Sequence, residues 1–459
     1  MLVALDYLFI GLYLLLLIFL GLHQRNTSNE SFLLSERSLT TAQTTTSIFS
    51  SNIGAGVLIT YTALVYLFGL GALWFFIGTV LGYFVFFFFA KKIKKLSDKK
   101  KYYTLPDFFF DSKGRSTGYL VSFLVFVSMF GWVLTNFIGG AKIVENYSSL
   151  PFTWSVGVMG SIILLYVIIG GFQSVVRTDA IQTLGIALLV VLMVFLVSTY
   201  SHTIPYQDFN LFSLPLIQLV NFFLAGILFP FASAELWQRV YAAKSQEVLK
   251  KSIVHASVLY LLTGIILLCI GLVIRNTVAG LDPDVALISG LSTLLPVGLS
   301  GLAVIVFYSA IMSSADTYLF TANASLIQNL LARWIPMRAD TLVIVMRISL
   351  SVLMTIVIVG ALVVEDVVDA TFLFVALMMS LAVVVLAVWI RPSTNSFSLN
   401  SSIGMSFFGV IILAFVQGIS INLVLTSLGL SIVGLFLGGS NVFLVNKYRQ
   451  YRVLARYKD

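Results

Sequence analysis

The sequence is poor in the residues that build soluble surfaces and reactive sites. Only 10% of its 459 residues are charged, whereas 59% are hydrophobic and the mean hydropathy is +1.02. The single cysteine, Cys269, excludes an intrachain disulfide and a site built from several cysteines. Three scattered histidines, and no Walker loop or Gly-x-Ser-x-Gly elbow, argue against a metal cluster, an ATP-driven pump or any other enzyme.

Long apolar runs fill most of the chain, and a soluble domain could not hide that much apolar surface. About thirteen of the runs are long enough to cross a ~30 Å hydrocarbon core. We therefore expect an all-α, polytopic membrane protein. Its predicted spans are 3–22, 43–68, 72–94, 118–145, 153–171, 177–199, 214–236, 253–275, 297–328, 341–364, 368–390, 402–420 and 423–446.

The basic residues gather in every second connection between these spans. Of the 27 lysines and arginines, only Lys142 and Arg275 fall elsewhere. Basic loops stay cytoplasmic, so the pattern predicts a plasma (inner) membrane protein with its N-terminus outside and a basic cytoplasmic tail at 447–459. The net charge of +8 is explained by this topology and by anionic lipid headgroups, and nucleic acid is not an expected partner.

Two spans contain residues that interrupt helices. The second reads Ser50-Ser51-Asn52-Ile53-Gly54-Ala55-Gly56, in which asparagine beside two glycines weakens a helix and offers polar groups. The seventh reads Phe229-Pro230-Phe231-Ala232-Ser233, in which the proline frees a backbone carbonyl. The two spans are five apart and enter the membrane in opposite directions. We interpret them as matching broken helices of two inverted halves around a transport site, rather than as two unrelated kinks.

The ninth span carries a polar face that suits a cation. Ala310, Ser313 and Ser314 lie at i, i+3 and i+4, so they share one side of a helix. Two hydroxyls with backbone carbonyls suit a hard monovalent cation, and the second span offers further oxygens at Ser50 and Ile53. The alternative is that these small side chains only allow close helix packing.

Acids of the sixth, seventh and ninth predicted spans are candidates for a structural or ion-binding role. Asp179 begins the sixth span, where an acid is costly unless it binds an ion, pairs with Arg177 or caps the helix. Glu235 and Arg239 stand at i and i+4 and predict a structural ion pair. Asp316 lies one turn from the serine pair of the ninth span, and we expect a structural or gating role for it.

Four motifs, in this order, resemble the sodium/solute symporter family, which includes sodium/proline, sodium/galactose and sodium/sialic acid symporters. They are residues 51–56, residues 170–182, residues 238–245 and residues 310–314. The resemblance implies a five-plus-five inverted-repeat fold of the leucine-transporter type, with discontinuous second and seventh helices. It assigns 43–199 to the first repeat, 214–390 to the second, 3–22 to an extra N-terminal helix and 402–446 to two C-terminal helices.

The resemblance also implies the coupling ion and its ligands. Sodium (Na⁺) is expected between Ser50, Ile53, Ala310, Ser313 and Ser314. In some relatives a second sodium lies next to the acid that corresponds to Asp179. The resemblance therefore also allows a second sodium site at Asp179.

The candidate solute pocket combines the broken second span with spans four and seven. Its predicted residues are Asn52, Gly54, Gly56, Trp132, Asn136, Phe137, Phe231 and Ser233. The polar pair that binds sugar in the galactose transporter falls at Gly56 and Val57, which argues against a sugar. The exposed amides of a broken helix favour a carboxylate, so an amino acid or a small organic acid is the favoured solute.

The sequence therefore predicts sodium-coupled symport of a small organic solute by alternating access, with no obligate protein partner. Two alternatives remain open. One is a symporter driven by protons. The other is a membrane receptor that binds solute without transport, although no signalling domain is attached to this chain.

Overall fold

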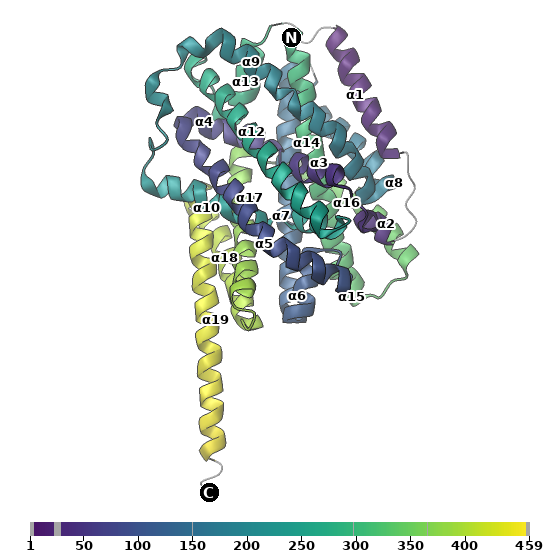
Figure 1. The fold of residues 1–459 in the computed structure, drawn as a ribbon, viewed down its shortest axis with the longest axis vertical. Coiled ribbons are helices and arrows are strands. Elements are labelled where there is room, and N and C mark those ends of the chain that lie inside the picture. Colours follow the sequence, from purple (N-terminus) through teal and green to yellow (C-terminus); the bar gives the residue numbers. More distant parts are fainter. Residues whose placement is uncertain (1–3, 23–28, 149, 297, 365, 456–459) are drawn as a thin grey trace.

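The computed structural model describes residues 4–22, 29–148, 150–296, 298–364 and 366–455, and every regular element in these ranges is a helix. The long helices lie side by side in one bundle, and the end of α19 (Asn422–Ala455) extends beyond the others (Figure 1). Some residues of the predicted elements lie outside the described ranges. They are residue 3 of the first predicted span, Arg25 between the first two spans, residue 297 of the ninth span and residues 456–459 of the tail.

Nine helical stretches of the described chain are long and apolar enough to cross a membrane, and a bent pair makes a tenth. The bent pair consists of α10 (Leu216–Ala232) and α11 (Ala234–Ala242), which differ in direction by 44°. The other long helices are α1 Ala4–Leu22, α3 Thr41–Ser51, α5 Trp74–Lys100, α7 Arg115–Tyr147, α8 Phe152–Ala187, α9 Leu189–Tyr200, α12 Gln246–Thr277, α14 Leu299–Ala324, α16 Ala339–Ala361, α17 Val367–Ile390 and α18 Ser396–Gln417.

Short helical segments lie between these long elements. They are α2 Asn29–Leu34, η1 Ser35–Arg37, η2 Gly56–Tyr61, α4 Thr62–Phe68, η3 Gly69–Leu73, α6 Leu105–Lys113, η4 Ser201–Thr203, η5 Tyr206–Phe209, η6 Pro283–Val285, α13 Ala286–Leu294, η7 Ser325–Leu331 and α15 Ala332–Trp334. Two of them, η2 and η7, are π-helical.

The sequence explains where several helices begin and break. Thr40 and Gln43 form a capping box at the start of α3, which satisfies backbone donors that would otherwise be unpaired. The predicted break of the second span lies after Ser51, where α3 ends and Asn52 begins a non-helical turn. In the seventh span the helix continues through Pro230, so its break falls later, at Ser233.

Helix α14 occupies the centre of the bundle. It packs against α7, α8 and α3, and every residue from Ser309 to Ala324 is buried. The turn after α3 lies against this central helix, because Ser314 Oγ donates to the carbonyl of Ser51 at 2.9 Å. The fold thus brings the polar face of the predicted ninth span to the break of the second.

Candidate functional site

A buried carboxylate connects four helices beside this break. Asp179 on α8 accepts hydrogen bonds from Ser47 Oγ at 2.6 Å and Ser50 Oγ at 3.1 Å, both on α3. It also accepts one from Ser313 Oγ of α14 at 2.5 Å. A guanidinium nitrogen of Arg239 on α11 lies 3.7 Å from the same carboxylate, and both side chains are almost completely buried. The three hydroxyls and the cation offset the large cost of burying this charge.

The predicted ion pair between Glu235 and Arg239 is wrong. The Arg239 guanidinium donates to the backbone carbonyl of Glu235 at 3.3 Å, to Ser47 Oγ at 3.0 Å and to Thr317 Oγ1 at 2.6 Å. Its carboxylate partner is Asp179, from a distant part of the chain. Within the described residues Arg239, and not Arg177, pairs with Asp179, because α11 packs against α3 and α14.

Two more buried acids lie near this cluster. Asp316 accepts from the Tyr166 hydroxyl at 2.6 Å through one oxygen, and its other oxygen has no hydrogen-bond partner among the described residues. Glu235 is 1% exposed, and its Oε2 is likewise without a partner in the part of the chain that the structure describes. Of these three buried carboxylates, only Asp179 forms an ion pair with Arg239 within the described residues.

The predicted sodium ligands lie on the two segments that this cluster joins. Ser50 and Ser313 donate to the same Asp179 carboxyl oxygen, and all five predicted ligands are buried. Ile53 and Ala310 lie on the turn after α3 and on α14, respectively. The donor set consists of hydroxyl, carbonyl and carboxylate oxygens, which are the ligands that hard cations prefer. A hydroxyl can donate its proton to Asp179 and still offer a lone pair to a cation.

A cavity lies next to the broken segment. Its volume is about 70 Å³, several times the roughly 10–15 Å³ that one water molecule needs. Its wall is mostly apolar and aromatic, and no charged side chain lines it. The lining residues are Asn52, Gly54, Gly56, Val57, Thr60, Tyr61, Leu64, Phe75, Trp132, Asn136, Phe222, Ala225, Phe229, Tyr318, Thr371, Phe372, Val375, Ile421 and Val424.

Two buried oxygens at this wall lack partners among the described residues, the side-chain carbonyl of Asn52 and the hydroxyl of Tyr61. The backbone amide of Gly54, in the non-helical turn, also makes no hydrogen bond within the described ranges. A buried polar group without a partner is costly, so these groups suit a polar ligand or water.

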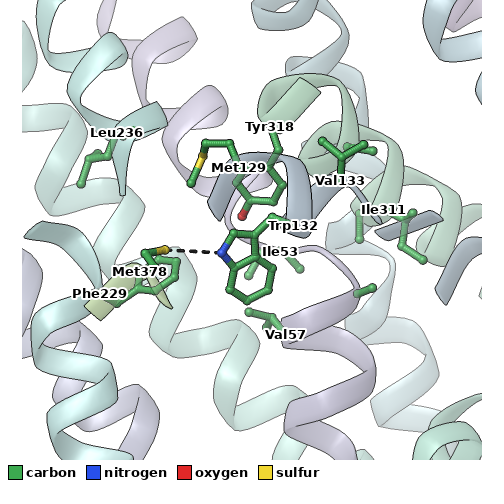
Figure 2. Close-up of a cluster of buried hydrophobic side chains, with 14 of the residues drawn as sticks. Ile53, Val57, Met129, Trp132, Val133, Phe229, Leu236, Ile311, Tyr318 and Met378 are labelled. Atoms are coloured by element: carbon green, nitrogen blue, oxygen red, sulfur yellow. Dashed lines mark hydrogen bonds between the residues drawn. The ribbon is translucent and has the colours of Figure 1, made fainter. Parts of the chain in front are cut away.

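Trp132 covers one side of the cavity from α7. Its indole nitrogen donates to the sulfur of Met378 at 3.4 Å, and Ile53 and Val57 of the broken segment lie near the ring (Figure 2). The ring of Tyr318 lies beside the indole, with 6.0 Å between ring centroids. This arrangement requires a glycine at 56, because an added Cβ would lie 2.5 Å from Cζ3 of Trp132.

The structure brings together five of the eight predicted solute residues at the cavity, namely Asn52, Gly54, Gly56, Trp132 and Asn136. The other three lie outside its lining. Phe231 packs edge-on against Phe86 and Phe89, Ser233 Oγ donates to the Phe229 carbonyl at 2.9 Å, and Phe137 is fully buried in the core.

Sequence reasoning missed most of the opposite wall. Phe229 belongs to the seventh-span stretch that the sequence singled out, so it could have been included. Thr371 on α17 and Ile421 before α19 carry no local signal, because only the packing of α17 and α19 brings them to the cavity. Thr371 does make one polar contact there, since Thr60 Oγ1 donates to its hydroxyl at 2.9 Å.

Asn136 holds the turn in place, and its removal is expected to destabilise the protein. Its Oδ1 accepts from the Ala55 amide at 2.9 Å and its Nδ2 donates to the Trp132 carbonyl at 2.7 Å, both buried. Asn136→Ala leaves a buried amide unpaired, so we expect a loss of about 1–3 kcal/mol. Thermal unfolding of the purified variant measures this. Asn146→Ala, on the exposed end of the same helix, is the control, and equal melting temperatures for both variants would contradict this role.

A broken membrane helix whose polar groups meet a central cavity is the site architecture of secondary transporters. The sequence pattern of the Sodium:solute symporter family matches residues 32–404, most of the chain. The chain belongs to this family, and it is a multi-pass membrane protein of the sodium-coupled solute symporter class.

Curated relatives and solved structures agree with this assignment. The chain is 25% identical over 348 residues to sodium/proline symporter 2 of Staphylococcus saprophyticus, covering 71% of this chain and 68% of the relative. It is 27% identical over 266 residues to the sodium/proline symporter of Staphylococcus aureus strain Newman, where it spans only 52% of the relative's length.

The fold is shared with two solved transporters. One is a Na⁺-coupled sialic acid symporter in a substrate-bound outward-open state, with a TM-score of 0.80, 16% identity and coverage of 95% of this chain and 97% of that one. The other is a nucleobase-cation-symport-1 family transporter in a closed conformation, with a TM-score of 0.59, 14% identity and coverage of 92% and 96%.

Proposed function

We propose that this protein moves a small organic solute into the cell together with sodium by alternating access. The observation that carries the proposal is the continuity between the oxygen cluster and the cavity. Ser50 and Ser313 bind Asp179, and Asn52 and Gly54, only a few residues further along the chain, line the cavity. A cation at the cluster and a solute in the cavity would both stabilise the broken segment between them.

The proposed sodium site uses the carbonyls of Ser50, Ile53 and Ala310 and the hydroxyls of Ser313 and Ser314. The buried acids support a cation site, because Asp179 pairs with Arg239 whereas Asp316 and Glu235 each keep an oxygen without a partner among the described residues, which is costly in a membrane interior. Asp179 is the proposed ligand of a second sodium. A charge that moves through 100 mV yields about 2.3 kcal/mol and a tenfold gradient about 1.4, enough for one sodium to sustain roughly 500-fold solute accumulation.

The proposed solute is small, with an apolar part, and an amino acid is favoured over a sugar. In this proposal the unpartnered Gly54 amide donates to a carboxylate and the unpartnered Asn52 carbonyl accepts from an amine, while Trp132 and Phe229 offer apolar contact. Sodium/proline symporters among the relatives favour the same solute class. Phe137, Phe231 and Ser233 are proposed to support the wall from behind.

We also propose the full arrangement of about thirteen spans in two inverted repeats, with the N-terminus outside. Two continuous stretches, Gly56–Lys100 and Phe152–Thr203, are 45 and 52 residues long, far more than the ~20 residues that one crossing needs. Each contains a glycine with positive φ that permits a reversal, Gly69 at 61° and Gly171 at 55°. The alternation of basic loops supports the orientation and the proposed domain limits.

Replacing either hydroxyl of the proposed sodium site is expected to raise the sodium requirement. Ser313→Ala and Ser314→Ala each remove one ligand, so half-maximal uptake should need about tenfold more sodium, equivalent to about 1.4 kcal/mol. Ser309→Ala, on the same helix, is the control, because its hydroxyl contacts Ile305 and Tyr13 instead. Unchanged sodium dependence in both variants would exclude these hydroxyls as ligands.

Uptake into vesicles reconstituted with the purified protein tests the proposed function. An inward sodium gradient should drive accumulation of a labelled amino acid from a panel, and choline should not replace sodium. Accumulation driven by a pH gradient without sodium would favour a proton-coupled symporter. Saturable binding without accumulation under either gradient would favour a receptor.

A further inference from the structure

A second cavity lies far along the bundle from the solute cavity, where α5, α6 and the end of α17 meet. Its volume is about 460 Å³. Both α5 and α17 change there from apolar residues to charged ones, at Lys91 and Arg391. The cavity therefore lies where two predicted membrane helices reach the water. Its lining residues are Lys92, Lys95, Leu96, Lys99, Phe108, Ser112, Lys113, Val388, Trp389 and Pro392.

Four lysines and no acidic residue line this cavity. Lys92, Lys95 and Lys99 are exposed and lie at i, i+3 and i+7, on one face of α5. None of these three makes an ion pair with a described residue. The fourth, Lys113, is held at the rim, because its ammonium donates to the carbonyls of Pro392 at 2.5 Å and Thr394 at 2.8 Å.

The acids nearby are already occupied by other lysines. Lys94 pairs with Asp98 at 2.7 Å and Lys100 pairs with Asp111 at 3.2 Å. The hydrogen bond from the Tyr102 hydroxyl lowers the pKa of the Asp111 carboxyl, which keeps that acid charged. The positive charge that faces the cavity is therefore left without an internal partner in the described chain.

The cavity also has an apolar wall that continues along the membrane-facing surface. Phe108 and Trp389 stack at its floor with 5.9 Å between ring centroids and 6° between ring planes. Phe84 and Phe88 lie two turns and one turn before Lys92 on α5 and are 63% and 56% exposed, respectively. A ligand with an anionic head and apolar chains could contact both surfaces at once.

We propose that this cavity binds the phosphate headgroup of an anionic phospholipid, with the acyl chains along Phe84 and Phe88. Basic pockets between membrane helices on the cytoplasmic side bind such headgroups. A soluble phosphate would match the lysines as well, but it would leave the exposed aromatic surface of α5 unused. This site is separate from the sodium and solute cluster and does not depend on the solute.

Binding of phosphatidylglycerol to the purified full-length protein tests the proposal. The test variant is Lys92→Gln/Lys95→Gln/Lys99→Gln. The control, Lys244→Gln/Lys250→Gln/Lys251→Gln, removes the same charge from exposed lysines near the start of α12. Native mass spectrometry and melting temperature in detergent, with phosphatidylglycerol or phosphatidylcholine added, are the readouts.

The wild type and the control should bind phosphatidylglycerol in preference to phosphatidylcholine, and the test variant should bind it about a hundredfold more weakly. Arginine at the same three positions should preserve binding, because the charge is kept. Equal losses in test and control variants would show general surface attraction and overturn the site. Displacement of the lipid by millimolar inorganic phosphate would identify the ligand of this cavity as a soluble anion and would overturn the proposal.

Discussion

Asp179→Asn is expected to abolish sodium-dependent uptake and to destabilise the protein by about 3–5 kcal/mol. The substitution removes the charge that Ser47, Ser50, Ser313 and Arg239 surround, and it leaves the buried guanidinium of Arg239 without its ion-pair partner. A neutral amide also places N–H donors where hydroxyl donors now point. Both consequences weaken the contact of α3 with α8 and α14.

A second variant separates the effect on protein stability from the effect on sodium-dependent uptake. Asp179→Asn/Arg239→Gln removes both charges, so it should recover part of the lost stability but no response to sodium. Asp98→Asn, at the half-exposed partner of Lys94, is the control and should keep full sodium dependence. Sodium-dependent uptake in the single variant, at the wild-type sodium requirement, would contradict the role of Asp179.

Gly54→Ala is expected to destabilise the protein by about 1–3 kcal/mol and to block transport. An added Cβ at this position would lie 2.5 Å from Asn136 Oδ1 and 2.6 Å from Ser314 Oγ. These atoms hold the broken segment, because Asn136 binds the Ala55 amide and Ser314 binds the Ser51 carbonyl. The methyl group must displace both contacts or move the turn away from α14.

Melting temperature and uptake by the same preparation measure this effect. Gly157→Ala is the matched control, because a Cβ there meets no atom within 4 Å and α8 is helical at that position. The control should melt at or slightly above the wild-type temperature, since alanine favours a helix by about 0.5–1 kcal/mol over glycine. Wild-type transport by Gly54→Ala would show that the close approach of this turn to α14 is not required.

Local sequence signals predicted the parts of the site that lie on single segments. The Asn52, Gly54 and Gly56 triplet predicted an interrupted helix, and the interruption lies at that place. The spacing of Ser313 and Ser314 predicted a shared face, and both hydroxyls meet groups of α3 or α8. Backbone propensity and helical period are properties of adjacent residues, so they can be read without tertiary contacts.

Contacts between distant segments were not predictable in the same way. The i and i+4 spacing predicted an ion pair between Arg239 and Glu235. Tertiary packing instead brings Asp179 next to Arg239, and the ion pair forms there. The cavity wall from Thr371 and Ile421 depends on how α17 and α19 pack, which a single sequence does not encode at any one position. The order of four motifs carried the resemblance to the family. The choice of solute depends on which side chains line the cavity, and the motifs do not specify these.

Melting temperature of the purified protein, in sodium or in choline with a panel of amino acids, carboxylates and sugars, tests the central claim most directly. A ligand that binds only the folded state raises the melting temperature by mass action. We expect sodium alone to stabilise the protein, and one amino acid to stabilise it further only when sodium is present. Stabilisation by a solute that is equal in sodium and choline, with no effect of sodium itself, would contradict sodium coupling at this site.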